Sequence, residues 1–267
     1  MALNPADFED LERAVALLEN PGFAARLNHV VGSPIEKAFT FLPAPLAGSV
    51  HEASRKAIEK ALKLAIFTLN AERQQRSSAN LTHQVLSGLS GAVGGFFGAP
   101  ALVVELPLST TIILRSIADI ARSEGESIAT IKAKMACLEV FALGGRSRSD
   151  DGAETGYYAV RTVLAKSVSE AVRYLAQQRV VDETAPALVK LVAKIASRFG
   201  ITVTQKLAAQ AVPVLGAFGG ATVNVLFTNH FQAMARGHFI VRRLERRYGE
   251  EAVRLAYERL RGELAQG

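Results

Sequence analysis

Apolar residues recur along this chain at helical spacing rather than in the alternation that is typical of strands. Near the start, Phe8, Leu11 and Val15 follow one another at intervals of three or four residues, after Asn4 and Pro5, which suit the first positions of a helix. No segment combines strand-like alternation with a hairpin turn. The pattern therefore predicts an all-α fold.

The breaks in this pattern divide the chain into elements. Pro107 is expected to begin a helix that ends at Gly125, Ser127 to cap the next helix, and Gly200 to end a helix that starts at Pro186. The predicted elements are N-terminal helices within 4–76, a glycine-rich hairpin over 80–124, helices within 127–211, a glycine-rich helix over 213–247 and a C-terminal helix over 250–264.

The most unusual stretch is Val85–Arg115, which is nearly all apolar, contains five glycines and carries one charge, Glu105, before its final arginine. Four of its glycines fall on one face of a helix: Gly88, Gly91, Gly95 and Gly98. Each costs about 1 kcal/mol of helix stability relative to alanine. Such a face indicates that a second helix backbone approaches it closely.

A second stretch, Val212–Thr228, echoes the first, and Gly216, Gly220 and Asn224 share one of its helix faces. No composition break separates two domains. We therefore predict a single multi-helix domain over residues 1–267, with the two glycine-rich apolar helices packed together at its centre.

The length of Val85–Val104 suits a membrane span of about 20 residues. Its glycines and Pro100 make it a poor one. Three interpretations stay open: a buried hairpin in a soluble protein, which we favour, an interfacial or re-entrant membrane segment, and a transmembrane helix.

Composition narrows the class of protein. Apolar residues make up 49% of the chain and the mean hydropathy is +0.17, which excludes general disorder. The lone Cys137 lies in an apolar run and is expected to be buried, with no disulfide to require an oxidising compartment. The acidic N-terminus does not resemble a signal peptide, so a cytoplasmic location is expected.

The net charge of +6 is concentrated near the C-terminus, where eight arginines and four glutamates lie between Arg236 and Arg261. They form a solvated helix face, or they contact an anionic membrane surface. The basic residues assigned to the membrane interpretation are Arg242, Arg243, Arg246 and Arg247. No nucleic-acid partner is expected, because no nucleic-acid-binding motif accompanies them.

Candidate chemistry is sparse. There is no nucleotide-binding glycine loop, no nucleophile elbow and no metal-ligand spacing among the five histidines, so neither a cofactor nor a metal is expected. Glu105 must be ion-paired, protonated or at a water-filled site, and Arg115 is its nearest strong partner in the sequence. Glu105, Arg115 and Asn224 form either structural contacts or a ligand-facing site.

Several motifs together resemble the EcsC family, from about Asp10 to about Phe239. They are SGAVGGFFG (90–98), Glu105-Leu106-Pro107, ILRSIADIARSEGE (113–126), LEVFALGG (138–145), YYAVR (157–161) and PVLGAFGGATVN (213–224). Family members often have aspartate where this chain has Glu105. The resemblance implies a bacterial intracellular protein with a link to the membrane, and it brings no established activity or catalytic set.

Three functions remain open. The leading hypothesis is a non-enzymatic protein, peripheral on the inner face of the membrane, that binds lipid or a membrane-protein partner such as a transporter. The alternative is a hydrolase-type enzyme with Glu105 in a cleft. The third is an oligomerising module in which glycine faces pack between chains.

Overall fold

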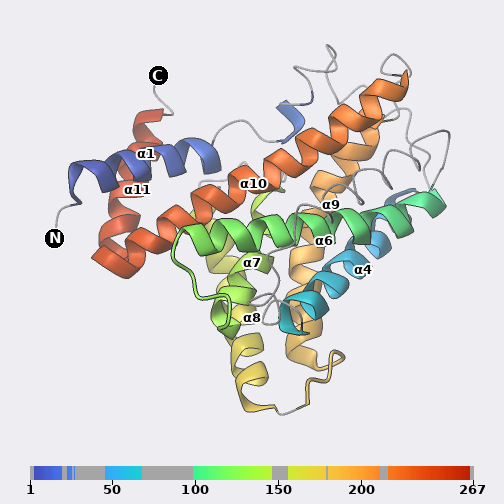
Figure 1. Cartoon of the computed structure of the whole chain (residues 1–267), viewed down its shortest axis with the longest axis horizontal. Helices are drawn as coiled ribbons and strands as arrows, with labels where there is room; N and C mark the ends of the chain where they lie inside the picture. Colours follow the sequence, from blue (N-terminus) through green and yellow to red (C-terminus); the bar gives the residue numbers. More distant parts are fainter. Residues whose placement is uncertain are drawn as a thin grey trace.

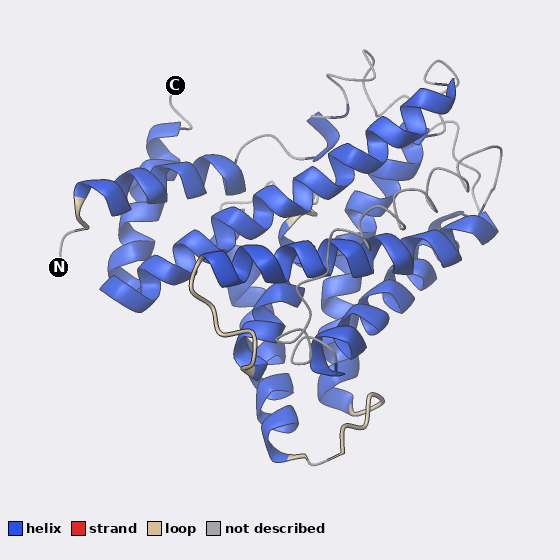
Figure 2. Ribbon diagram, in the orientation of Figure 1, coloured by secondary structure: helices blue, strands red, loops and turns tan. Residues whose placement is uncertain are grey.

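The chain is helical almost throughout the part that its structure, a computed structural model, describes (Figure 2). The described residues are 3–19, 23–25, 27, 46–67, 99–145, 156–178, 180–210 and 216–264. None of them lies in a strand, so the prediction of an all-α fold is confirmed.

Helix α10 organises the described part of the molecule. The helices in these ranges are α1 (Pro5–Glu19), α4 (Leu46–Phe67), α6 (Ala99–Ser123), α7 (Ile131–Leu143), α8 (Tyr157–Gln177), α9 (Pro186–Gln210), α10 (Gly216–Tyr248) and α11 (Glu250–Leu264). With 33 residues, α10 is about 50 Å long, and α6 runs beside it (Figure 1). Helix α4 packs on α6 and α9, and α7 packs on α8 and α9. Helices α1 and α11 pack against α10 near its C-terminal end.

Aromatic rings from three helices meet in the core. Phe141 of α7, Phe199 of α9, and Phe227 and Phe231 of α10 are each at most 1% exposed. Neighbouring ring centroids in this group lie 5.1 to 6.0 Å apart. Because burial of one such side chain contributes about 1.5–3 kcal/mol, this group is a large part of what holds α7, α9 and α10 together.

Helix α1 crosses α10 at a glycine. A Cβ atom on Gly237 would lie 2.6 Å from Cγ of Leu18 and 3.1 Å from the carbonyl oxygen of Ala14. The missing side chain lets the two helices approach closely, as was expected of the glycine-rich stretches. The sequence pattern did not single out this position.

Several predicted boundaries are confirmed. Oδ1 of Asn4 accepts a hydrogen bond of 2.8 Å from the backbone N–H of Asp7, which caps α1 as expected. Gly125, with φ of +78°, follows the end of α6, and Gly249, with φ of +87°, separates α10 from α11. Both positions need a left-handed conformation that glycine adopts without strain.

The expected start of a helix at Pro107 is wrong, because α6 begins at Ala99 and carries the proline inside it. Proline has no N–H to donate within the helix. The hydroxyls of Thr110 and Thr111 donate back to the carbonyl oxygens of Leu106 and Pro107, at 2.7 and 2.8 Å. Packing of α6 on α4 and α10 outweighs the local cost of the proline.

Two further predicted boundaries are wrong. Thr130, not Ser127, caps α7, and its side-chain oxygen accepts a hydrogen bond from the backbone N–H of Ala133. Ser127 instead begins a turn, and its carbonyl oxygen accepts a hydrogen bond from the hydroxyl of Thr130. Helix α9 continues through Gly200, which faces Ser54 of α4. There a glycine serves helix packing instead of ending the helix.

The glycine stretches lie largely outside the described residues. That holds for Gly88, Gly91, Gly95 and Gly98, and for the proposed contact between the two stretches. Gly216 and Gly220 lie in the first turns of α10, whose packing there is also outside the description. None of the described helices is long and apolar enough to cross a membrane.

Candidate functional site

Glu105 of α6 pairs with a buried lysine from α9. Nζ of Lys206 donates a 2.7 Å hydrogen bond to Oε1 of Glu105, and it lies 4.9 Å from the centroid of the Phe227 ring of α10. The lysine side chain is 1% exposed and the glutamate side chain 30% exposed. The carboxylate and the ring face offset the cost of burying the ammonium group, and the pair joins three helices.

Arg115 is not the partner of Glu105. Ten residues along α6 correspond to about 15 Å, which is too far for an ion pair. The expected Glu105–Arg115 pair is therefore wrong: the fold brings Lys206 from 101 positions away instead.

Asn224 lies one turn before Phe227 on α10. Its Oδ1 atom is buried and has no hydrogen-bond partner among the described residues. Residues three apart share a helix face, so Asn224 lies on the side of α10 that faces Lys206. The contacts of the described residues join Glu105 to Lys206 and place neither Asn224 nor Arg115 in that pair. A ligand at these residues stays a prediction.

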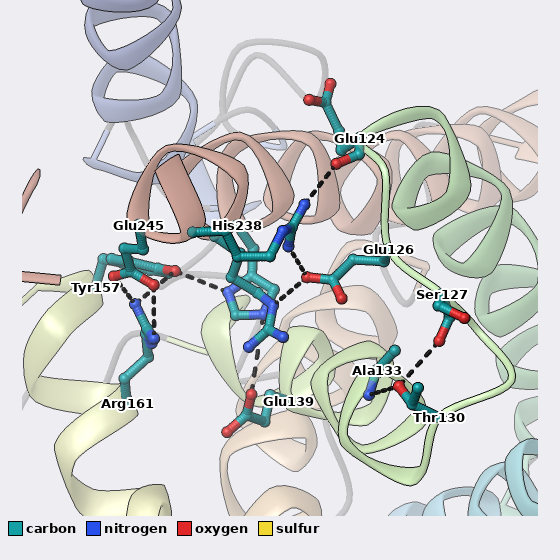
Figure 3. Close-up of polar contacts among 12 residues, drawn as sticks. Glu124, Glu126, Ser127, Thr130, Ala133, Glu139, Tyr157, Arg161, His238 and Glu245 are labelled. Atoms are coloured by element: carbon teal, nitrogen blue, oxygen red, sulfur yellow. Dashed lines mark hydrogen bonds and ion pairs between the residues drawn. The ribbon is translucent and has the colours of Figure 1, made fainter. Parts of the chain in front are cut away.

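A second polar group, missed by the sequence analysis, surrounds the start of α8 (Figure 3). The hydroxyl of Tyr157 and Nδ1 of His238 are 2.9 Å apart, and Nε2 of His238 lies 3.9 Å from Oε2 of Glu139. Arg161 holds Glu245 with two hydrogen bonds, of 2.5 and 3.1 Å. The group connects α7, α8 and α10.

The hydrogen bonds favour one tautomer of His238. Nη1 of Arg161 donates to the Tyr157 oxygen at 3.3 Å, and the Tyr157 hydroxyl and Nδ1 of His238 share a bond whose direction depends on the tautomer. Because the Tyr157 oxygen already accepts one hydrogen bond, we assign its proton to the bond with Nδ1 and the imidazole proton to Nε2, on the side of Glu139. Burial, with Arg242 and Arg161 nearby, lowers the pKa of His238 well below 6.5, and burial raises the pKa of Glu139.

The two side chains at the centre of this group are buried, so a substrate does not reach them directly. His238 is 0% exposed and Tyr157 is 3% exposed. Burial also raises the pKa of the Tyr157 hydroxyl, so it is a poor nucleophile. Tyr257 stacks near Tyr157, with ring centroids 5.5 Å apart, and donates a 2.7 Å hydrogen bond to Glu19 of α1. Together these contacts link α7, α8, α10 and α11 to one another and to α1.

Acidification is expected to destabilise the protein through His238. Because the unfolded chain binds a proton near pH 6.5 and the folded chain does not, this contribution is complete above that pH and is lost below it, at about 1 kcal/mol per pH unit. Glu139, with its raised pKa, acts in the opposite sense, since its cost to the fold shrinks as the pH falls toward 4.5.

The comparison that isolates His238 is wild type against His238→Asn, whose amide oxygen can accept from Tyr157. Chemical denaturation at a series of pH values measures the difference in unfolding free energy between them. We expect the advantage of wild type to shrink from about pH 7 to about pH 5.5. A difference that does not change with pH would contradict the assignment.

Two of the C-terminal arginines of α10 hold the loop that follows α6 (Figure 3). Nε of Arg242 donates to Oε1 of Glu126 at 2.8 Å. Arg246 pairs with the same carboxylate and donates to the carbonyl oxygen of Glu124 at 2.8 Å. The Glu126 side chain is 8% exposed, so these contacts are largely shielded from water.

The other two arginines hold α1. Arg247 donates to Oδ2 of Asp7 at 2.8 Å, and Arg243 pairs with Asp10. Asp7 also accepts a 2.6 Å hydrogen bond from the hydroxyl of Tyr248. All four arginines assigned to a membrane surface are thus matched by carboxylates of the same chain. Their contact with a membrane stays a prediction.

The remaining candidate side chains are those of Cys137 and the histidines. Cys137 is buried as expected, and burial raises the pKa of its thiol to about 12, so it is inert. Nε2 of buried His230 lies 3.0 Å from the carbonyl oxygen of Gly144. In the described ranges, no three histidine, cysteine or acidic side chains are grouped to hold a metal ion.

Fold and contacts together define an all-α protein in which buried acidic, basic and tyrosine side chains join helices from distant parts of the chain. The chain belongs to the EcsC protein family, which it matches over residues 6–244. No curated protein and no solved structure matches it. Two motifs of the resemblance contribute directly to the buried group: 138–145 supplies Glu139, and 157–161 supplies Tyr157 and Arg161.

Proposed function

We propose that this EcsC-family protein is a non-enzymatic helical protein that associates peripherally with the membrane and binds lipid or a membrane-protein partner. One observation carries the proposal: α6 and α10 both begin toward the same end of the molecule (Figure 1). The two glycine-rich apolar stretches lead into these helices at Ala99 and Gly216. Ala99 and Gly216, where these stretches join the two helices in the sequence, therefore lie toward the same end.

Exposed apolar side chains on the same two helices support this orientation. Leu108 of α6 is 47% exposed and Val225 of α10 is 54% exposed. Each is the tenth residue of its helix. Apolar side chains at a membrane interface gain free energy by leaving water, so they are the chemistry expected at a lipid-facing end.

The charged end of α10 is less suited to be the membrane contact. Its arginines are matched by Asp7, Asp10, Glu124 and Glu126, which reduces the attraction to anionic lipid. Membrane association is thus proposed to rest on apolar contact more than on charge.

The hydrolase alternative receives less support. Glu105 is neutralised by Lys206, and a general base needs a carboxylate within reach of a substrate proton. The buried Glu139, His238 and Tyr157 lack access to solvent. Bacterial origin and a location on the inner face of the membrane belong to the same proposal and rest on the family resemblance.

Vesicle co-sedimentation tests the proposed association. Wild type is expected to sediment with vesicles of mixed phosphatidylcholine and phosphatidylglycerol. The double variant Leu108→Glu/Val225→Glu is expected to bind vesicles at least about tenfold more weakly than wild type, because two apolar contacts become charged.

The matched control is Val189→Glu/Leu255→Glu, which alters two side chains of similar exposure, 51% and 63%, on α9 and α11. It should bind like wild type. Equal binding by both double variants, or no sedimentation of wild type, would reject the proposal.

A further inference from the structure

A cleft lies between α1, α6 and α10. Its volume is about 500 Å³, which lies within the usual range for ligand pockets. The walls come from the C-terminal half of α6 and the middle of α10, and α1 closes one side with Leu17. The cleft is separate from the Glu105 junction, so this inference does not depend on the proposed membrane association.

Most charges that line the cleft are already matched. Asp119 pairs with Arg122, Glu124 with Arg243, and Arg13 with Asp10. Arg236 differs: its exposed guanidinium makes no ion pair or hydrogen bond with the described residues. Arg236 is therefore the one charged side chain of the lining that has no ion-pair partner among the described residues.

The polar lining beside Arg236 offers hydrogen-bond donors. Nε2 of Gln232 donates to Oγ of Ser116 at 2.8 Å, across the junction of α10 and α6. The Ser116 hydroxyl thus acts as an acceptor in this bond and keeps its own proton for another partner, and the Gln232 amide keeps a second N–H. A ligand with acceptor oxygens would satisfy these groups.

Three side chains of the lining are apolar. Leu17 of α1, Ile120 of α6 and Ile240 of α10 contribute a hydrocarbon surface to a cleft that also contains the guanidinium. A hydrocarbon chain can cover that surface while a single anionic group reaches Arg236. A dianion would leave one charge unmatched.

We propose that this cleft binds a soluble amphipathic monoanion, a carboxylate that carries a short hydrocarbon chain. The carboxylate pairs with Arg236 and accepts from the Ser116 hydroxyl, and the chain packs on Leu17, Ile120 and Ile240. The charge of Arg236 favours a ligand with an anionic group, and the apolar lining favours a ligand with a hydrocarbon chain.

Octanoate is the probe, and its uncharged analogue octanamide is the matched ligand. Titration of protein with isotope-labelled isoleucine methyl groups, followed by NMR, reports on the cleft through Ile120 and Ile240. Octanoate is expected to shift these two signals saturably. Octanamide should bind at least about tenfold more weakly than octanoate, because it lacks the charge that pairs with Arg236.

Arg236→Met keeps the length of the side chain and removes its charge. Since Arg236 is exposed, the fold should be retained, and octanoate affinity is expected to fall about tenfold. Ser116→Ala is expected to lower it about threefold. Arg254→Met, at an exposed arginine of α11, is the control and should bind like wild type.

Equal affinity for octanoate and octanamide would overturn the proposal, and so would wild-type affinity in Arg236→Met. Shifts confined to isoleucines away from the cleft would also overturn it. The comparison of the two ligands uses only wild-type protein, so it decides the question even if a variant fails to fold.

Discussion

Replacing Gly145 with alanine is expected to lower the free energy of unfolding by about 3 kcal/mol, because the new methyl group has no room. A Cβ atom at this position would lie 2.1 Å from the backbone carbonyl oxygen of Arg198. Backbone cannot rotate away as a side chain can. The turn after α7 would have to separate from α9, and the 3.1 Å hydrogen bond from Arg198 to the Gly145 carbonyl would be strained.

Chemical denaturation of the purified variant measures this change. The matched control is Gly262→Ala on α11, where a Cβ atom would meet nothing within 4 Å. There alanine should stabilise the helix by about 0.5–1 kcal/mol, because it loses less conformational freedom on folding. A loss below about 1 kcal/mol in Gly145→Ala would mean that the contact between α7 and α9 is looser than the structure describes.

The Glu105–Lys206 pair is expected to respond asymmetrically to substitution. Glu105→Leu should destabilise the protein by about 3 kcal/mol, because it leaves a buried ammonium group without its counter-charge. Lys206→Met should cost about 1 kcal/mol or less, because the apolar side chain fills the same space and the partly exposed Glu105 can turn to water.

The double variant Glu105→Leu/Lys206→Met completes the cycle and should recover most of the loss seen in Glu105→Leu. Unfolding free energies of the four proteins give the coupling between the two positions. If the two single variants lose the same unfolding free energy and the double variant recovers none of it, the buried ammonium group of Lys206 is not stabilised by Glu105. Arg115→Met, outside the pair, should show no coupling with Glu105.

The periodic pattern of the sequence predicts the helices well and their partners poorly. Helical spacing and the signals at Asn4 and Gly125 locate helix ends correctly, because these signals act within one turn. Pro107 and Gly200 mislead for the same reason. Their local cost is real, and contacts with helices distant in sequence outweigh it.

The polar sites depend on which helix faces which, and a single sequence does not contain that information. An ion pair is one of the states expected for Glu105, yet its partner Lys206 lies 101 positions away in an ordinary amphipathic helix. Tyr157 and His238 are 81 positions apart. The lone signal for the second group was Glu139, a carboxylate within the apolar run of α7.

The close helix crossings show the same limit. Glycine spacing predicts close helix contacts at Gly88 to Gly98 and at Gly216, and these contacts lie outside the described part of the structure. Close approaches of another helix are found at Gly144, Gly145 and Gly237, which follow no glycine pattern. An isolated glycine signals a crossing only after its neighbour is known.

The clasp between α1 and the end of α10 has a consequence for how the chain is made. Tyr248 and Arg247 hold Asp7 across 241 and 240 positions. At about 5–20 residues per second, a ribosome needs roughly 12–48 s to make the residues between them. During that time α1 lacks the surface of α10 that it will occupy, so its apolar side, with Leu11, Val15 and Leu18, is open to chaperones once it has left the ribosome.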